Sequence, residues 1–390
     1  MRKRVIFLAA GLFAGACARL VNPIGAPDNH TVAFLSPEAP GATRIVLFDA
    51  SSVQVRSIAI PAPWKANTLT WIDNKLLIFG ERPLAAPHQS VFDSRMLDPA
   101  TEQFTPTPIS SQYPFMPFAG RWQGKACIFS SGTKVDTTDI RALPDFAILG
   151  SLDFPVEGLR DGWMLHSQMP AGMKANWSSH GWMVSDGKTA EGGERFHMAT
   201  FEAIDVLDGD AKVVMQLDRA AIKAAFGRDL TLFTAALSPD HRTFLLAPRL
   251  TMIAGNGRWP RSDIYPYGYT VFEVATGKRL YAQKGEAAVT APAVLADEGI
   301  YAVIGDPHPG AIDAEERHTW LTLQDAKGIQ RLVELPVPPK LDYEAGYNTT
   351  ASPDGKTLFI TWWKPKPQLC VVPLRPDVKA AELRVLNLPK

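Results

Sequence analysis

The sequence predicts an all-β protein: a seven-bladed β-propeller of four-stranded antiparallel blades, with one short helix between blades four and five. Short apolar strands recur along the chain, and a tight polar turn precedes each of them. The 32 Pro and 29 Gly residues indicate many short elements joined by turns. A hydrophobic content of 46% is enough to fill a core of this size.

Seven apolar strands align when each is placed after the polar turn that precedes it. Their first residues lie between 45 and 62 positions apart, and the turns have the composition of hairpin turns. The seven repeat strands are Thr31–Leu35, Leu76–Phe79, Ala126–Phe129, Gly181–Val184, Thr243–Leu246, Ile300–Ile304 and Leu358–Trp362.

Further strands follow within each unit. We expect the next strand at places such as Phe146–Leu149 and Tyr269–Phe272, and a last strand at places such as Lys212–Leu217. Four antiparallel strands repeated seven times are typical of a propeller. Between units four and five, Asp218 to Gly227 has an N-cap residue, an Ala-rich interior and a final Gly, which predicts a short packing helix.

The first blade can be completed in two ways. Either Val21–Ala26 forms its inner strand, or the C-terminal segment Glu382–Leu388 closes the ring as a shared strand. Both alternatives keep the count at seven blades.

Two of the repeats carry a motif that resembles one of a known protein family. Leu237-Ser-Pro-Asp-His241 and Ala351-Ser-Pro-Asp-Gly355 precede repeat strands, and they resemble the Ser-Pro-Asp-Gly turn of WD-like and Tol-type bacterial β-propellers. Because this motif builds the turn between two strands, the resemblance implies the fold and says little about function.

The first residues have the pattern of an export signal. A basic start, Arg2 to Arg4, precedes an uncharged run from Val5 to Ala16 that is too short to span a bilayer as a helix. The run ends at Ala14-Gly15-Ala16-Cys17, which resembles a bacterial lipobox although Ala14 replaces the preferred Leu. The alternative is an ordinary signal site before the same Cys.

The lipobox resemblance implies an N-terminal lipid on Cys17 and a mature protein held on a membrane. The resulting domain plan is a lipoprotein-type signal peptide over residues 1–16 and a single propeller domain over residues 17–390. Since Ala18 is not the Asp of an inner-membrane retention signal, we expect the periplasmic face of the outer membrane.

Charge and cysteine content exclude several classes of function. Lys and Arg number 40 and Asp and Glu also number 40, so no net charge favours nucleic acid as a partner. Cys127 and Cys370 fall in different predicted blades, which predicts two separate buried thiols rather than a disulfide. Nucleotide-binding, haem and zinc motifs are absent from the sequence, so we expect no cofactor, no metal and no catalytic residue.

The loops that leave the repeat strands emerge on one face, where we expect binding. The longest lies in blade five and combines Arg with aromatic residues, a composition typical of binding hot spots; its alternative role is to shield the blade edge. The candidate binding residues are Arg249, Arg258, Trp259, Arg261, Asp263, Tyr265, Tyr267, Glu81, Arg82 and His308.

Together these patterns favour a lipid-anchored binding or scaffold protein whose loop face docks an envelope protein or assembly. Two alternatives stay open: a glycan or small-ligand binding protein, and a propeller enzyme of the lactonase or lyase type. No complete catalytic constellation is visible in the sequence, which favours a protein without enzymatic activity.

Overall fold

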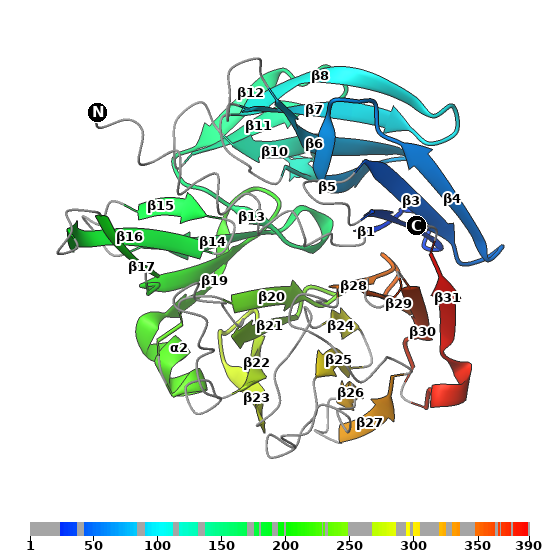
Figure 1. Cartoon of the computed structure of the whole chain (residues 1–390). Coiled ribbons are helices and arrows are strands. Elements are labelled where there is room, and N and C mark those ends of the chain that lie inside the picture. The colour runs from blue at the N-terminus through cyan, green and yellow to red at the C-terminus, as the bar shows by residue number, and fades with distance from the viewer. Residues whose placement is uncertain are drawn as a thin grey trace.

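The computed structural model describes residues 24–36, 43–83, 90–111, 117–131, 137–169, 175–178, 181–188, 194–198, 200–227, 229–230, 233–248, 267–285, 294–296, 299–304, 320–324, 330–335, 348–362, 366, 368–375 and 377–388. Within this part of the chain, antiparallel sheets stand around a central axis as the blades of a β-propeller (Figure 1). None of the helices described there is long and apolar enough to cross a membrane.

Six blades each use four strands that are consecutive in the chain. Three precede residue 153: β1 (Ile24–Gly25), β2 (Thr31–Leu35), β3 (Arg44–Asp49) and β4 (Gln54–Ala59); β5 (Lys65–Ile72), β6 (Lys75–Pro83), β7 (Ser90–Asp98) and β8 (Gln103–Ser111); β9 (Phe118–Trp122), β10 (Lys125–Ser131), β11 (Thr138–Ala142) and β12 (Ile148–Leu152). Three follow residue 232: β20 (Phe233–Leu237), β21 (Thr243–Pro248), β22 (Tyr267–Glu273) and β23 (Arg279–Gly285); β24 (Val294–Ala296), β25 (Gly299–Ile304), β26 (Trp320–Gln324) and β27 (Gln330–Glu334); β28 (Asn348–Ala351), β29 (Thr357–Trp362), β30 (Gln368–Pro373) and β31 (Arg384–Asn387).

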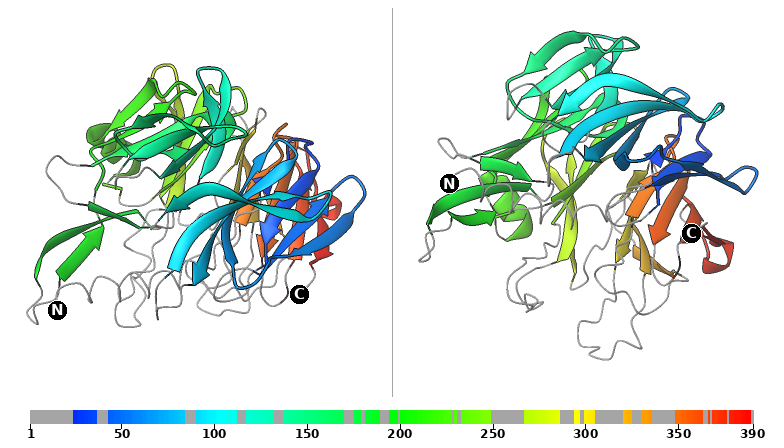
Figure 2. Two further views of the ribbon diagram at one scale, coloured as in Figure 1. Left: turned by 90° about the horizontal axis from the view of Figure 1, so that it is seen from above. Right: turned by 45° about the horizontal axis from the view of Figure 1, so that its top comes forward.

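The fourth predicted unit is different, so the prediction of seven regular blades is wrong: six follow the pattern. Its place is taken by a composite sheet of β13 (Glu157–Gly158), β14 (Met164–Gln168), β18 (Ala203–Leu207) and β19 (Val213–Asp218). A separate sheet of β15 (Ala175–Ser178), β16 (Gly181–Lys188) and β17 (Glu194–Met198) is inserted between β14 and β18. The predicted repeat strand Gly181–Val184 lies in this insert, which projects away from the composite sheet (Figure 2).

One strand predicted for blade three is also wrong: Phe146–Leu149 is not the strand that follows the repeat strand. Phe146 lies in a turn with positive φ, where its amide donates to the carbonyl of Ala142, and Ile148–Leu152 is the outermost strand of the sheet. The strand that does follow the repeat strand is Thr138–Ala142, and its polar residues Thr138, Asp139 and Arg141 make it hard to recognise by hydrophobicity.

The core lies between adjacent blades. The repeat strands β2, β10, β21 and β29 each contribute a fully buried phenylalanine: Phe34, Phe129, Phe244 and Phe359. Phe359, Leu369 and Leu388 of the last blade belong to the same buried cluster as the first two blades. Hydrophobic packing therefore continues across the junction between the two ends of the chain.

The ring closes without a strand shared between the chain ends. Of the two alternatives for the first blade, the first is confirmed: β1 pairs with β2, and the C-terminal β31 completes its own blade by pairing with β30. Gly25 of β1 lies against β28, and a side-chain methyl at this glycine would approach the Ala351 carbonyl oxygen to 3.0 Å. Across the same junction, the Asp354 amide donates to Asn29 Oδ1 at 2.8 Å.

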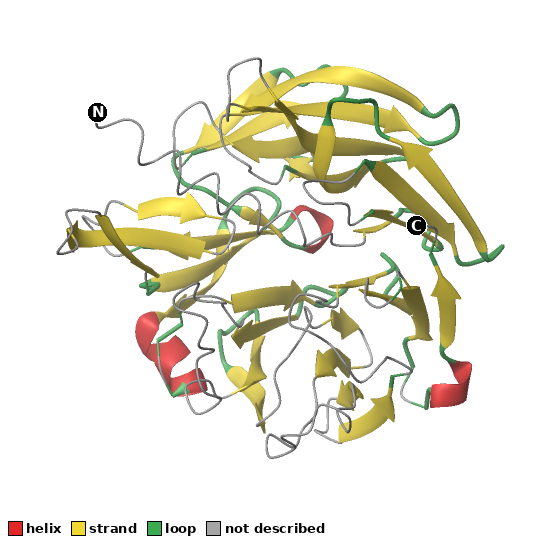
Figure 3. Ribbon diagram, in the orientation of Figure 1, coloured by secondary structure: helices red, strands yellow, loops and turns green. Residues whose placement is uncertain are grey.

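The predicted helix is confirmed between the composite sheet and the next blade. Helix α2 (Arg219–Phe226) begins after Asp218, whose carboxylate accepts from the Ala221 amide at 2.7 Å, and it ends at Gly227 in the left-handed conformation. Ile222 and Ala225 are buried in the core on one side of it. Its role as a packing element is therefore also confirmed (Figure 3).

The prediction of two separate buried thiols is confirmed as well. Cys127 and Cys370 are free and fully buried, in β10 and β30 respectively. Burial raises the pKa of Cys127 to about 11 and that of Cys370 to about 12, so both remain neutral hydrophobic side chains at neutral pH.

Candidate functional site

The two ends of the ring differ in construction. At one end of the ring, which we call the turn face, the first strand of a blade leads into the second and the third leads into the fourth. At the other end, which we call the loop face, the second strand leads into the third. The turn face has short turns fixed by side-chain hydrogen bonds, such as those of Asp49 and Asp240. The loop face carries the elongated hairpin of β6 and β7 and, in the composite sheet, the three-stranded insert.

Few of the predicted binding residues fall in the described part of the chain. Glu81 and Arg82 lie at the loop-face end of β6, and Tyr267 is the first residue of β22. The others lie outside the described residues, and so does the predicted lipidation site Cys17: they are Arg249, Arg258, Trp259, Arg261, Asp263, Tyr265 and His308.

At the end of the long hairpin, Arg82 forms an ion pair with Asp93. The Arg82 Nε lies 3.4 Å from Asp93 Oδ2, and 47% of the Arg82 side chain is exposed. In the register of the sheet, Glu81 stands opposite Lys65 on β5 and opposite Phe92 on β7. The two predicted residues therefore belong to a charged cluster of mixed sign at the rim of the loop face.

Next to this ion pair lies a pair of Trp64 and Arg95, neither of which is among the predicted binding residues. Trp64, in the link between β4 and β5, is 1% exposed, and the Arg95 guanidinium carbon lies 4.8 Å from the centre of its ring. The glycine at position 80 makes room for the indole, because a side-chain methyl there would lie 2.8 Å from Trp64 Cε2. No sequence signal reveals this pair, since it depends on the register of β6 against β7.

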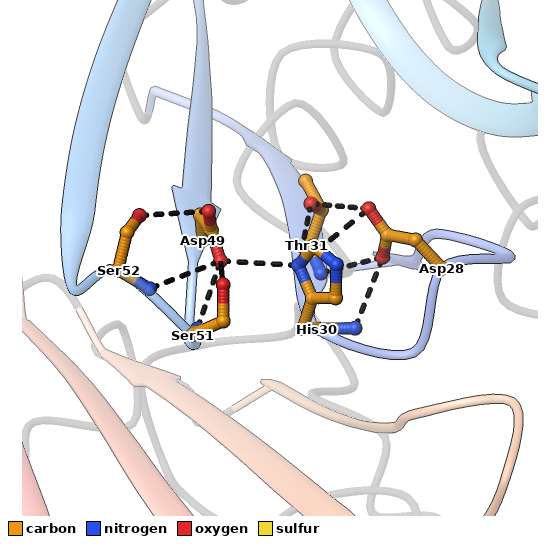
Figure 4. Close-up of polar contacts among 6 residues, drawn as sticks. All are labelled: Asp28, His30, Thr31, Asp49, Ser51 and Ser52. Atoms are coloured by element: carbon orange, nitrogen blue, oxygen red, sulfur yellow. Dashed lines mark hydrogen bonds and ion pairs between the residues drawn. The ribbon is translucent and has the colours of Figure 1, made fainter.

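On the turn face, His30 lies between two carboxylates (Figure 4). Its Nδ1 is 3.0 Å from Asp49 Oδ1 and 3.7 Å from Asp28 Oδ2. Asp49 also accepts hydrogen bonds from the hydroxyl groups of Ser51 and Ser52. The hydrogen bond from the Ser51 hydroxyl, ahead of the other contacts, holds the pKa of Asp49 well below its usual range.

This cluster contains the residue types of a hydrolase triad but not its geometry. In a triad the His accepts the proton of the Ser, whereas here the imidazole and both hydroxyl groups point to the same carboxylate (Figure 4). The arrangement therefore ties the turn after β1 to the turn after β3. Its role is to stabilise the first blade.

A second His on the turn face links two sheets. His241 Nε2 lies 3.2 Å from Asp161 Oδ2 of the 3₁₀ turn η1 (Arg160–Gly162), and its ring stacks on Trp163 with the centres 4.7 Å apart. The Asp161 side chain is 59% exposed and the His241 side chain 28%. The contact joins the composite sheet to the blade that follows it.

A cavity of about 700 Å³ occupies the axis of the ring. Its wall consists mainly of small residues of the inner strands, and the charged residues that line it are Asp73, Arg121, Arg160 and Asp161. Among the described residues, no group of three or more His, Cys, Asp or Glu side chains is placed to hold a metal ion. The cavity can accommodate a small polar ligand, with charges of both signs in its lining.

A buried carboxylate lies in the composite sheet. Asp205 is 2% exposed, and it accepts hydrogen bonds from the amide groups of Gln168 at 2.6 Å and Gln216 at 2.8 Å. Both oxygens have a partner, so the group is explained as part of the packing. Its neighbour across the strands is His166.

Comparison with known proteins identifies the fold. No family model matches the sequence, and no curated protein matches it. Among solved structures, the complex of KlAtg21 with the coiled coil of AgAtg16 is 10% identical, with 95% of this chain and 100% of the other covered and a TM-score of 0.55. Hsv2 of Kluyvelomyces marxianus is 10% identical, with 94% and 97% covered and a TM-score of 0.51. With its four-stranded antiparallel blades, this chain shares the β-propeller fold of these two structures.

Proposed function

We propose that the protein is a binding scaffold of the cell envelope that docks a partner protein on its loop face. The observation that carries this proposal is the difference between the two ends of the ring. Among the described residues, several turns of the turn face have polar side chains occupied by hydrogen bonds within the molecule, as around Asp49 and Asp240. The loop face instead carries the elongated β6–β7 hairpin and the inserted sheet, and such additions to a rigid scaffold are typical of binding surfaces.

The similar structures support a protein as the partner. The Atg21 structure contains a bound coiled coil of a second protein, so the propeller fold is compatible with docking a protein segment. The β6–β7 hairpin adds Arg82, an exposed Arg at the rim, and Arg is enriched among interface hot spots.

We further propose that Cys17 carries a lipid that holds the propeller on the periplasmic face of the outer membrane. The lipobox-like run before Cys17 supports this proposal. The test is fractionation of cells that produce the Cys17→Ala variant. A lipid anchor predicts that this variant leaves the membrane fraction, whereas a variant that stays there would contradict the anchor.

The docking face is tested by photo-crosslinking in cells. A photoreactive amino acid at Glu81 reports on the loop face, and one at Ser52, an exposed residue of the turn face, is the matched control. We expect a discrete protein adduct, identified by mass spectrometry, from position 81 only. Equal adducts from both positions, or none from position 81, would overturn the proposal.

The axial cavity favours a second candidate function, the binding of a glycan or another small polar ligand. Arg121 and Arg160 line the cavity together with Asp73 and Asp161, and mixed charges of this kind can orient a polar ligand. Glycan-array binding that is lost in Arg121→Gln would support this candidate. Binding unaffected by that substitution would remove the cavity as the site.

A further inference from the structure

Strand β12 forms the outer edge of the third blade (Figure 1). It pairs with β11 on one side, and none of the described strands pairs with its other side. An edge of this kind is a template for an additional strand, and proteins usually protect it with charged residues or prolines. The residues of the strand therefore decide whether the edge is open to another chain.

This strand lacks the protection that the other outermost strands carry. Its five residues, Ile-Leu-Gly-Ser-Leu, include no charge and no proline. Each of the other outermost strands of the six blades and of the composite sheet contains at least one such residue: Arg56 in β4, Pro106 in β8, Asp218 in β19, Arg279 in β23, Arg331 in β27 and Arg384 in β31. Among these described edges, that of β12 alone is unprotected by its composition.

Two neighbouring apolar side chains of β12 are exposed. Ile148 is 54% exposed and Leu149 is 41% exposed, and among the described residues they are the only consecutive large apolar residues of which both are exposed. The register explains this arrangement, because Arg141 pairs with Ile148 and Ile140 with Gly150, so that Leu149 is the extra residue of a β-bulge. Since a bulge changes the direction of a side chain, it places two apolar groups at the start of one open edge.

Acidic residues stand at both ends of this edge. Asp145 precedes β12 and Asp153 follows it directly, and both are exposed. In the described part of the chain, neither forms an ion pair with a basic residue. Two copies of the edge in antiparallel pairing would bring Asp145 of one copy near Asp153 of the other, and like charges oppose such pairing. The charges therefore favour a basic segment of another protein over a second copy of this chain.

We propose that β12 binds an extended segment of another protein, which adds a fifth strand to the blade and carries apolar residues between basic ends. Its backbone groups bond to the open side of β12, and its alternate apolar side chains cover Ile148 and Leu149. Its basic ends lie near Asp145 and Asp153. This surface is on the outer side of the ring rather than on the loop face, so the inference goes beyond the proposed function and does not depend on it.

The test measures amide hydrogen exchange by mass spectrometry in residues 148–152. The probe is the capped synthetic peptide Lys-Val-Thr-Val-Thr-Val-Lys in large excess, and we expect it to slow exchange in this segment by about tenfold or more, because added backbone hydrogen bonds protect the edge amides. A counterpart with Glu at both ends should bind about tenfold more weakly, and one with Pro at its centre should give no protection. Unchanged exchange with the basic peptide, or equal protection by all three, would overturn the proposal.

Ile148→Lys and Val213→Lys form a matched pair of variants, because both residues are 54% exposed and each is the first residue of an outermost strand. Ile148→Lys places a positive charge against the basic peptide and should weaken binding by about tenfold or more, whereas Val213→Lys should leave it unchanged. Equal weakening by both would overturn the assignment to β12. Asp153→Asn should weaken binding by about threefold, and an unchanged affinity would contradict the basic ends.

Light scattering of the protein alone tests the other occupant of this edge. A dimer of the parent protein that Ile148→Lys dissociates would show that β12 pairs with a second copy and would overturn the proposal. A monomer whose edge the basic peptide protects would support it. A thermal unfolding curve for each variant confirms that it is folded.

Discussion

The turn from Ser238 to Thr243 and the turn from Ser352 to Thr357 share one hydrogen-bonding scheme. In each, the Ser hydroxyl donates to the Asp two residues later and accepts from the Thr amide that starts the next strand. In each, the same Asp accepts from the amide two residues further on. The Ser-Pro-Asp motif thus specifies the same local structure twice.

The turns differ at the residue after the Asp, which has positive φ in both. Gly355 has φ 69°, and a side-chain methyl there would approach Pro239 Cγ of the other turn to 3.3 Å. His241 has φ 59°, and its ring extends to Asp161 and Trp163 of the composite sheet. The same position is therefore crowded for a side chain in one blade and used for a contact between sheets in the other. The shared motif therefore determines the conformation of the turn but not the contacts that the turn makes with the rest of the protein.

Exchanging the two residues should have the largest effect on stability. Gly355→His combines left-handed strain of about 1–2 kcal/mol with crowding against Pro239, so we expect a clear fall in the midpoint of chemical unfolding. His241→Gly relieves the same strain but loses the contacts with Asp161 and Trp163, so its net effect should be small. Equal destabilisation by the two substitutions would mean that space at position 355 is not limiting.

Removing the shared hydroxyl should affect both turns alike. Ser238→Ala and Ser352→Ala each leave the amide of the following Thr without its acceptor, at a cost of about 1–3 kcal/mol. Both Ser residues are buried, with 3% and 0% exposure, so water cannot easily replace the hydroxyl. Chemical unfolding of the two variants measures the loss of unfolding free energy in each. A loss in only one of them would contradict the shared role of the hydroxyl.

The contact between Asn29 and the turn from Ser352 to Thr357 can be tested separately. Asn29→Gly removes the amide oxygen that accepts from the Asp354 amide, while Gly tolerates the φ of 68° at this position. We expect a loss of about 0.5–1.5 kcal/mol in unfolding free energy, because one hydrogen bond across the ring closure disappears. The double variant with Ser352→Ala then shows whether the two contacts are coupled.

The smallest effect should come from pH and should distinguish two histidines. Burial lowers the pKa of His166, against the opposing influence of the Pro155 carbonyl and of Asp205. The unfolded chain therefore binds a proton more readily, so the stability contributed by neutral His166 is complete above the ordinary pKa of about 6.5 and is lost as the pH falls below it. His241 is partly exposed and paired with Asp161.

We expect the unfolding midpoint of the parent protein to fall between pH 7 and pH 5, and His166→Gln to reduce that fall. His241→Gln is the control, because its partly exposed ring lacks this burial. A fall that is the same in the parent protein and in His166→Gln would assign the pH dependence to other groups.

The sequence predicted the propeller because strand hydrophobicity and turn residues are local signals. Six of the seven repeat strands were placed correctly, and helix α2 was identified by Asp218 and Gly227. The fourth unit was assigned wrongly because the inserted strand β16 carries the same apolar pattern as a blade strand. Spacing alone cannot distinguish an insertion within a blade from the blade itself.

The candidate site was less accessible to sequence analysis. Arg82 was selected as a charged rim residue, but its partner Asp93 and the Trp64–Arg95 pair arise from the register between strands. The two histidine contacts of the turn face join residues 19 and 80 positions apart in the chain. Contacts of this kind depend on how blades are placed beside each other, which no local pattern records.

The direction of β1 determines how the propeller would be oriented on a membrane. This strand leads into the turn at Asp28, so the chain enters it from the loop face. Cys17 lies only seven positions before Ile24, and seven fully extended steps of the chain reach about 25 Å. A lipid on Cys17 would thus tether the ring by its centre with the loop face toward the bilayer, and a docked partner would occupy the narrow layer between propeller and membrane.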